Sequence, residues 1–214
     1  MRLARGLPFT NIAGPSRRLR RWLLGLGAVA LVSLSAASAA HASDRIYWSN
    51  YEADKYRATL AALPDRPIRR ALEMGCSIGV FTEMLAERCG ELVAADFSAF
   101  AVKQTRKRLA GRRSVRVERR DLRDSIPSGP FDLVVCSEIL YYWSRPDVES
   151  ALDAIEAELD EDGAVVAVNW SGNDPTNPLD AVGVETILDR RSGLRRVHSE
   201  TAAGYRLGRW ERAG

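Results

Sequence analysis

The chain has 214 residues, of which 46% are hydrophobic and 28% charged, so it can form one domain with a sizeable core but not two full domains. Its formal net charge is +3, yet the first 42 residues hold six arginines and no acidic residue, which leaves a mildly acidic body. That balance argues against general nucleic-acid binding. The three cysteines lack the paired spacing of metal sites and disulfide frameworks, so we expect packing residues and no metal.

The first 43 residues form a segment of their own. Residues 17–21 are basic, residues 22–35 are mostly apolar, and Ala40-His41-Ala42 offers the small residues of a cleavage site, as in an export signal. Left uncleaved, residues 22–40 are just long enough for a membrane anchor. A disordered extension, or a start residue assigned too far upstream, is the alternative. We therefore separate residues 1–43 from a single domain over residues 44–214.

Apolar and aromatic residues at helical spacing predict a first helix over residues 49–63, before Pro64. Strand and helix patterns then alternate. The predicted strands are residues 70–74, 92–95, 115–118, 131–136, 164–168, 195–199 and 204–210. The predicted helices between them are residues 78–88, 98–109 with Ser98 as N-cap, 146–159 stopped by Asp162-Gly163, and 180–190.

Alternating strands and helices predict an α/β fold with right-handed crossovers. We expect a Rossmann-like, doubly wound, mostly parallel seven-stranded sheet with an antiparallel C-terminal edge strand. In such sheets a ligand lies beyond the carboxyl ends of the strands. Gly75, Asp96, Asp121 and Glu138 all follow predicted strands, so we expect them at that edge.

The turn after the first strand is the strongest functional signal. Gly75 and Gly79 flank a tight strand-to-helix turn, and Asp96 closes the next strand, where a carboxylate can accept hydrogen bonds from ribose hydroxyls. A dinucleotide fingerprint wants glycine at the first, third and sixth positions, but Ser77 and Val80 occupy the last two. An ordinary turn, with Asp96 as a helix cap, is the structural alternative.

Glu73, two residues before Gly75, and the small residues up to Gly79 resemble motif I of class I S-adenosylmethionine (SAM)-dependent methyltransferases. Residues 51–60, 71–79 and 137–142 together resemble the rhizobial nodulation protein S group of N-methyltransferases and its relatives. The resemblance runs from about Trp48 to the C-terminus. It implies a cytoplasmic enzyme that moves a methyl group from SAM to the amine of a de-N-acetylated chitooligosaccharide, although many relatives have other acceptors.

The resemblance implies cofactor contacts at Glu73, Gly75, Cys76, Ser77, Gly79, Asp96, Phe97, Asp121, Leu122 and Ser137. Gly75 and Gly79 would line the methionine part of SAM, Asp96 its ribose and Asp121 the adenine side. Residues 44–66 would carry an N-terminal lid helix with Tyr51, Lys55 and Tyr56. Asp121 also has the alternative of a solvated loop acid that balances neighbouring arginines.

Glu138 is the nearest carboxylate to propose as a general base or as a group that orients an ammonium, with Tyr141 as helper. Tyr141 and Tyr142 are aromatic residues that can wall a pocket around the sulfonium and the acceptor. Glu138 has the alternative role of a helix N-terminal acid. The loop at residues 171–175 lacks the histidine that the family carries there, which leaves the acceptor and any base from the loop open.

Two other functions compete with the methyltransferase hypothesis. One is a non-catalytic SAM-fold binding protein, and the other is a nicotinamide-dependent oxidoreductase, which Ser77 and Val80 disfavour. The expected partners are a small-molecule or oligosaccharide acceptor and no nucleic acid. Because SAM is made in the cytoplasm, the cofactor favours that location. Membrane association is expected only through residues 17–40, and the sequence predicts no oligomeric state.

Overall fold

The computed structural model describes residues 50–214, so the expectations for the N-terminal 43 residues, including a signal or anchor, lie outside it. Its strands are β1 Ile68–Met74, β2 Cys89–Asp96, β3 Val115–Arg119, β4 Phe131–Ser137, β5 Leu159–Trp170, β6 Leu194–Ala202 and β7 Tyr205–Arg212. Its helices are α3 Asn50–Ala61, α4 Val80–Leu85, α5 Ala99–Arg108, the short 3-10 helix η1 Leu140–Tyr142, α6 Arg145–Glu158 and α7 Ala181–Asp189.

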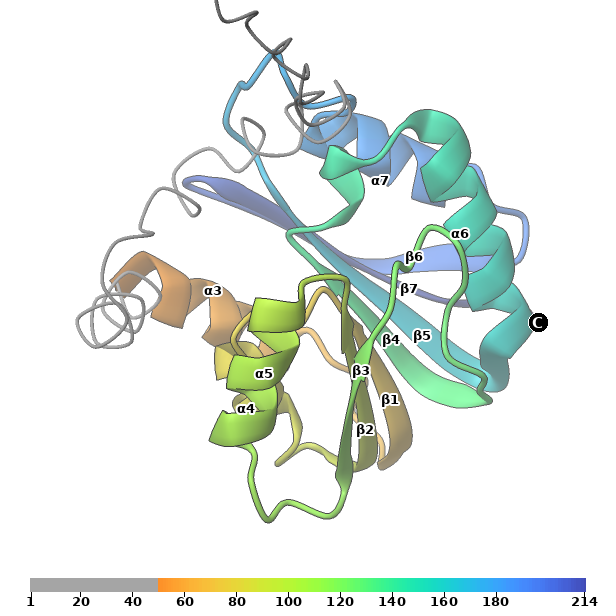
Figure 1. The fold of residues 1–214 in the computed structure, drawn as a ribbon. Coiled ribbons are helices and arrows are strands. Elements are labelled where there is room, and N and C mark those ends of the chain that lie inside the picture. Colours follow the sequence, from red (N-terminus) through yellow and green to blue (C-terminus); the bar gives the residue numbers. More distant parts are fainter. Residues whose placement is uncertain (1–49) are drawn as a thin grey trace, which may run out of the picture. The chain divides into compact units, whose positions relative to one another are not determined.

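These strands form one seven-stranded sheet in the order β3-β2-β1-β4-β5-β7-β6 (Figure 1). The pairs among β1 to β5 are all parallel, and β7 pairs antiparallel with both β5 and β6. The predicted α/β fold with a mostly parallel sheet is therefore confirmed. The final strand lies between β5 and β6, so the edge position belongs to β6.

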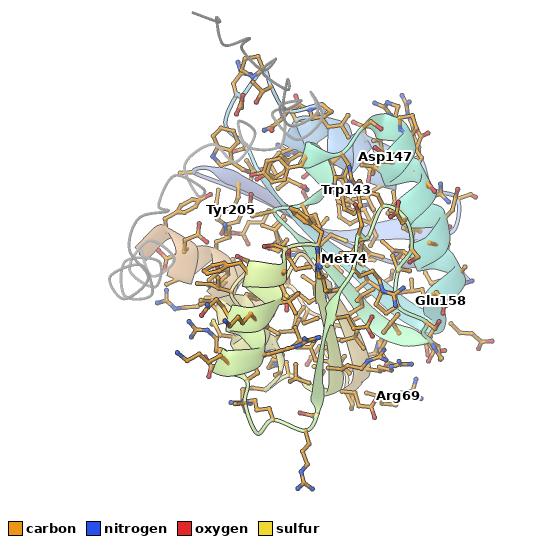
Figure 2. All side chains as sticks on the ribbon, in the orientation of Figure 1. Arg69, Met74, Trp143, Asp147, Glu158 and Tyr205 are labelled. Carbon is orange, nitrogen blue, oxygen red and sulfur yellow. The ribbon has the colours of Figure 1, made fainter. Side chains whose placement is uncertain are left out.

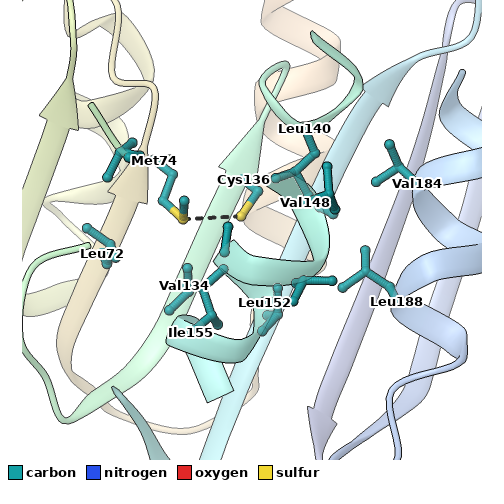
Figure 3. Packing of buried hydrophobic residues seen from close by; sticks show 14 of the residues in the cluster. Leu72, Met74, Val134, Cys136, Leu140, Val148, Leu152, Ile155, Val184 and Leu188 are labelled. Atoms are coloured by element: carbon teal, nitrogen blue, oxygen red, sulfur yellow. Dashed lines mark hydrogen bonds between the residues drawn. The ribbon is translucent and has the colours of Figure 1, made fainter. Parts of the chain in front are cut away.

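Helices cover both faces of the sheet, and each face has its own core (Figure 1). On one face α6 and α7 pack Leu152, Ile155 and Leu188 against Val134 of the central strand β4 (Figure 3). On the other face α3 and α4 pack Tyr56 and Leu85 against the sheet. Residues 131–136 of β4 are buried throughout, as expected for a strand covered on both faces.

The cap of α5 agrees with the sequence-based expectation, and the start of β5 does not. Ser98 caps α5 by accepting a hydrogen bond from the Ala101 amide, as predicted. In contrast, α6 ends at Glu158 and β5 begins at once with Leu159, which pairs with Phe131. The expected stop at Asp162-Gly163 is therefore wrong, because those residues belong to the strand. No helix within residues 50–214 is long and apolar enough to cross a bilayer.

Candidate active site

The carboxyl ends of β1, β2 and β4 meet at one edge of the sheet, where the predicted site residues gather. Figure 2 labels Met74, the last residue of β1, and Trp143, which lies in the connection from β4 to α6. Arg69 is labelled at the opposite end of the sheet, where it forms an ion pair of 2.8 Å with Asp132.

The turn from β1 to α4 has an unusual backbone. Gly75 and Gly79 have φ angles of 83° and 82°, and Ser77 between them has a φ of 49°. Left-handed conformations are unfavourable for residues with a side chain, so the two glycines are required and Ser77 is strained. A Cβ at Gly79 would lie 2.8 Å from Thr105 Cγ2 of α5, so this glycine also permits close packing of α5.

Asp96 fixes this turn from the end of β2. One carboxylate oxygen accepts the Ser77 amide at 3.0 Å, and the other accepts the Ser98 amide at 2.8 Å. A carboxylate has about four acceptor positions, so two stay available for hydroxyl donors. Burial raises the pKa of Asp96, and its two amide donors act in the opposite direction.

Glu73 lies behind the turn and is only 2% exposed. Its Oε2 atom has no hydrogen-bond partner among the described residues. Burial raises the pKa of Glu73 to about 7; the nearby Asp96 charge adds to this and the Thr82 hydroxyl opposes it. An unpartnered buried carboxyl directly behind a left-handed glycine turn is a polar group that a bound ligand can satisfy.

The two residues expected on the adenine side, Asp121 and Leu122, have different surroundings. Arg123 holds Asp121 through two side-chain contacts, at 2.9 and 2.5 Å, and lowers the pKa of that carboxyl. Arg123 therefore occupies most of the acceptor positions of Asp121 and leaves one for a ligand. Leu122 is 4% exposed and packs in the core on the α6 and α7 face, so its side chain does not line a site.

The other predicted cofactor residues divide into accessible and buried groups. Phe97 is 49% exposed beside Asp96, and Ser137 is half-buried at the end of β4. The Cys76 side chain is buried, and burial is the main reason that its pKa is raised far above the ordinary value. Cys76 therefore offers a ligand its backbone, not a reactive thiol.

Glu138 follows β4 with a left-handed φ of 56° and is held by three donors. Oε1 accepts from the Lys55 ammonium of α3 at 3.3 Å. Oε2 accepts from the Tyr141 hydroxyl at 2.7 Å and from the Trp170 amide at 3.3 Å. The Glu138 side chain is still 24% exposed, so the carboxylate also faces solvent.

Tyr141 and Tyr142 form a pair beside this carboxylate, with ring centroids 4.2 Å apart and hydroxyl oxygens 3.0 Å apart. Burial, followed by the charge of Glu138, raises the pKa of Tyr141 well above its ordinary range. Tyr141 therefore remains a neutral phenol that donates to Glu138. It can help to position the acid but cannot itself take up a proton.

Helix α3, the expected lid, is packed firmly against the domain. Lys55 is 4% exposed and pairs with Glu52 at 3.0 Å as well as with Glu138. Tyr51 donates a hydrogen bond to the Gly204 carbonyl at 2.9 Å. Tyr56 is a core residue, and its ring centroid lies 5.3 Å from that of Phe81. Lys55 and Tyr56 are both buried in this arrangement, and the role of α3 as a lid stays a prediction.

A cavity of about 390 Å³ lies one residue beyond Glu138, which is not itself part of the cavity lining. Its lining includes Tyr141 and Trp170, two residues that contact Glu138, together with Arg145 at the start of α6 and the loop at residues 172–180. Trp170 is 37% exposed. The cavity therefore places polar, charged and aromatic groups beside the carboxylate.

Sequence reasoning missed Arg145 and Trp170. The loop after β5 is rich in Asn, Pro and Gly and follows a buried strand on the ligand-binding edge, which was the available signal. The pairing of Lys55 with Glu138 joins residues 83 positions apart, and no local pattern reports it. Within residues 50–214 no group of three His, Cys, Asp or Glu side chains is placed to hold a metal ion.

A family model and the curated relatives point to the same protein family. The family model for nodulation protein S (NodS) matches residues 32–201. Nodulation protein S of Sinorhizobium fredii is 38% identical over 81 residues, which is 38% of each chain. Nodulation protein S of Bradyrhizobium diazoefficiens is 34% identical over 99 residues, covering 46% of this chain and 47% of that protein. The chain thus matches less than half the length of these curated relatives.

Solved structures extend the similarity over most of the chain. A protein of Pseudomonas syringae, solved as a candidate methyltransferase, is 37% identical with a TM-score of 0.66, covering 76% of this chain and 99% of that chain. The N-methyltransferase NodS of Bradyrhizobium japonicum, in complex with S-adenosyl-L-homocysteine, has a TM-score of 0.72 at 24% identity. That match covers 79% of this chain and 91% of that chain, and shows a shared fold.

Proposed function

The chain belongs to the nodulation protein S family, and we propose that it is a SAM-dependent methyltransferase that methylates an amine of a small molecule or oligosaccharide. The observation that carries the proposal is the bond between the Ser77 amide and the Asp96 carboxylate, at 3.0 Å. It fixes a left-handed glycine turn to an acid at the end of the neighbouring parallel strand. This arrangement suits an adenosyl ligand that lacks a pyrophosphate.

Several features of the site fit SAM. The turn at residues 75–79 would hold the methionine part, with the unpartnered Oε2 of Glu73 behind it. The two remaining acceptor positions of Asp96 would bind ribose hydroxyls, with the exposed Phe97 ring on the adenine side. SAM supplies an electrophilic methyl group on a sulfonium.

The chain's own contribution to methyl transfer is alignment and proton handling. An amine acceptor must lose its proton before it attacks a methyl carbon. Glu138 would receive the ammonium end of the acceptor and take up its proton, while Tyr141 holds the carboxylate in place. Lys55 positions the same carboxylate from α3, and the buried Tyr141 and Trp143 keep the core below the site dry.

The family to which the chain belongs suggests the first acceptor to consider. A deacetylated chitooligosaccharide amine is the specific candidate, because the relatives carry the name nodulation protein S. The loop at residues 171–175 departs from the family by lacking a histidine, so a different amine is the alternative. Since SAM is made in the cytoplasm, we assign the enzyme to that compartment.

The test is methyl transfer from radiolabelled SAM by the purified full chain, with deacetylated chitooligosaccharides and a set of simple amines as acceptors. Label in an N-methyl product supports the proposal, and the acceptor that it marks decides between oligosaccharide and small molecule. Binding of SAM without transfer to any acceptor would leave a non-catalytic SAM-binding protein. Binding of NAD in place of SAM would favour an oxidoreductase.

A further inference from the structure

The cavity that Tyr141 and Trp170 line has Arg145 as its one positively charged residue among residues 50–214. Arg145 is the first residue of α6, and its ion-pair partner within residues 50–214 is Glu149 at 3.7 Å. The two side chains are 45% and 49% exposed. An ion pair of that length and exposure contributes little, so the guanidinium is available to a ligand.

The two carboxylates that line the same cavity are already engaged. Asp174 accepts hydrogen bonds from the Thr176 amide at 2.9 Å and from the Thr176 hydroxyl at 2.7 Å. These bonds lower the pKa of Asp174, the amide making the larger contribution. Asp180 caps α7 by accepting the Gly183 amide at 2.6 Å. Each of these carboxylates is bonded through one oxygen within its own loop, and the guanidinium of Arg145 is the group in the described lining that can bind an anion.

The opposite charge lies where Glu138 adjoins the cavity through Tyr141 and Trp170. A partly exposed carboxylate suits an ammonium, and an available guanidinium suits a carboxylate or phosphate, which it binds through two parallel hydrogen bonds. A neutral amino sugar would use only the first of these groups. The pair of charged groups selects a ligand that carries both charges.

We propose that the acceptor is an amine that also carries an anionic group, a carboxylate or a phosphate, and that Arg145 binds this group while Glu138 binds the ammonium. This inference rests on the proposed methyltransferase function and narrows its acceptor class. Arg145 is then a specificity-determining residue. It touches the non-reacting end of the acceptor and takes no part in methyl transfer.

The experiment compares matched pairs of acceptor probes by calorimetry on the full chain, with and without saturating S-adenosylhomocysteine. The pairs are phosphoethanolamine with ethanolamine, and glucosamine 6-phosphate with glucosamine; glycine with glycinamide tests a carboxylate. We expect the anionic member of at least one pair to bind at least tenfold more tightly. Whether it is a phosphate or a carboxylate distinguishes the two sources of the charge.

Variants then assign the preference to the side chain. Arg145→Gln should abolish the difference within each pair and leave the neutral member unchanged, whereas Arg145→Lys should retain part of it. Glu149→Gln removes the partner of Arg145 and should maintain or strengthen anion binding. Arg145 lies at an exposed helix start, so a thermal melt of each variant checks folding.

Equal affinity for both members of every pair, absence of binding by all probes, or an equal loss for both members in Arg145→Gln would overturn the inference. These outcomes are separate from failure of the proposed function. If S-adenosylhomocysteine binds with measurable heat but no anionic probe is preferred, only the proposed anionic acceptor class is rejected. If S-adenosylhomocysteine gives no heat of binding, the proposed methyltransferase function is rejected. An anion preference measured without the cofactor would then show only that the cavity binds anions.

Discussion

The Glu138 carboxylate lies 3.3 Å from the Lys55 ammonium, and this contact connects the residue that follows β4 to helix α3. The Lys55 side chain is 5% exposed and also contacts Glu52, so one buried cation is shared by two carboxylates. Tyr141 and the Trp170 amide hold the other oxygen of Glu138. Glu138 is therefore fixed by Tyr141, three residues away, and by two segments distant in sequence, helix α3 and the end of β5.

Replacement of the candidate acid tests its catalytic role. Glu138→Gln keeps the shape of the side chain but cannot accept a proton, so we expect kcat to fall about 10² to 10⁴-fold with SAM affinity unchanged. Glu52→Gln is the matched control, because it also removes a Lys55 partner without touching Tyr141. A Glu138→Gln enzyme with wild-type kcat would refute the role of Glu138 as base.

Removal of the shared cation tests the connection to α3. Lys55→Met leaves Glu52 and Glu138 without their common partner, and because both are partly exposed we expect a loss of about 1–2 kcal/mol in the free energy of unfolding. Urea denaturation measures it. Arg57→Gln on the same helix removes an ion pair that is 68% and 67% exposed, and should change stability by less than about 0.5 kcal/mol. Equal effects of the two substitutions would contradict the account.

Substitution of Gly79 and Gly111, which have similar φ angles, distinguishes the cost of backbone strain from the cost of a packing clash. Gly79→Ala places a Cβ 2.8 Å from Thr105 Cγ2 and 3.1 Å from Thr105 Cα, at a φ of 82°. Gly111→Ala has a φ of 91° and no atom within 4 Å. We expect denaturation to show a loss of about 1–2 kcal/mol for Gly111→Ala from backbone strain, and a clearly larger loss for Gly79→Ala. Similar losses would mean that α5 moves aside easily.

The buried Glu73 predicts a pH dependence of stability. Its pKa rises from 4.5 to about 7 on folding, so between these values the unfolded chain releases a proton that the folded chain keeps. Stability therefore falls as the pH rises from about 4.5 to 7, by about 3 kcal/mol in total. Glu73→Gln should remove this slope in denaturation curves recorded from pH 4.5 to 8. An unchanged slope in the variant would exclude Glu73 as its origin.

Local patterns predicted the elements of the fold well. The mostly apolar run of β4, the Ser98 cap of α5 and the final hairpin were all recognisable because each depends on neighbouring residues. The start of β5 was not, since Leu159-Asp160-Glu161-Asp162-Gly163 resembles a helix end and turn. Pairing of Leu159 with Phe131, a tertiary contact, makes these residues a strand.

The candidate site was predicted in part for the same reason. The glycine turn and Asp96 follow from chain order along adjacent strands, and the structure brings them into contact. The burial of Leu122 and Tyr56, the engagement of Asp121 by Arg123 and the approach of Arg145 to the cavity depend on how distant segments pack. A single sequence carries no local signal for these.

If the turn at residues 75–79 and Asp96 bind an adenosyl sulfonium, calorimetric titration of the full chain with SAM detects that binding. We predict saturable binding at one site per chain, weakened at least tenfold in Asp96→Asn, about the effect of losing hydrogen bonds to a charged group. Asp121→Asn should weaken SAM binding less than Asp96→Asn does, because Arg123 already holds the Asp121 carboxylate. An absence of heat with SAM for the folded wild-type chain would contradict the account.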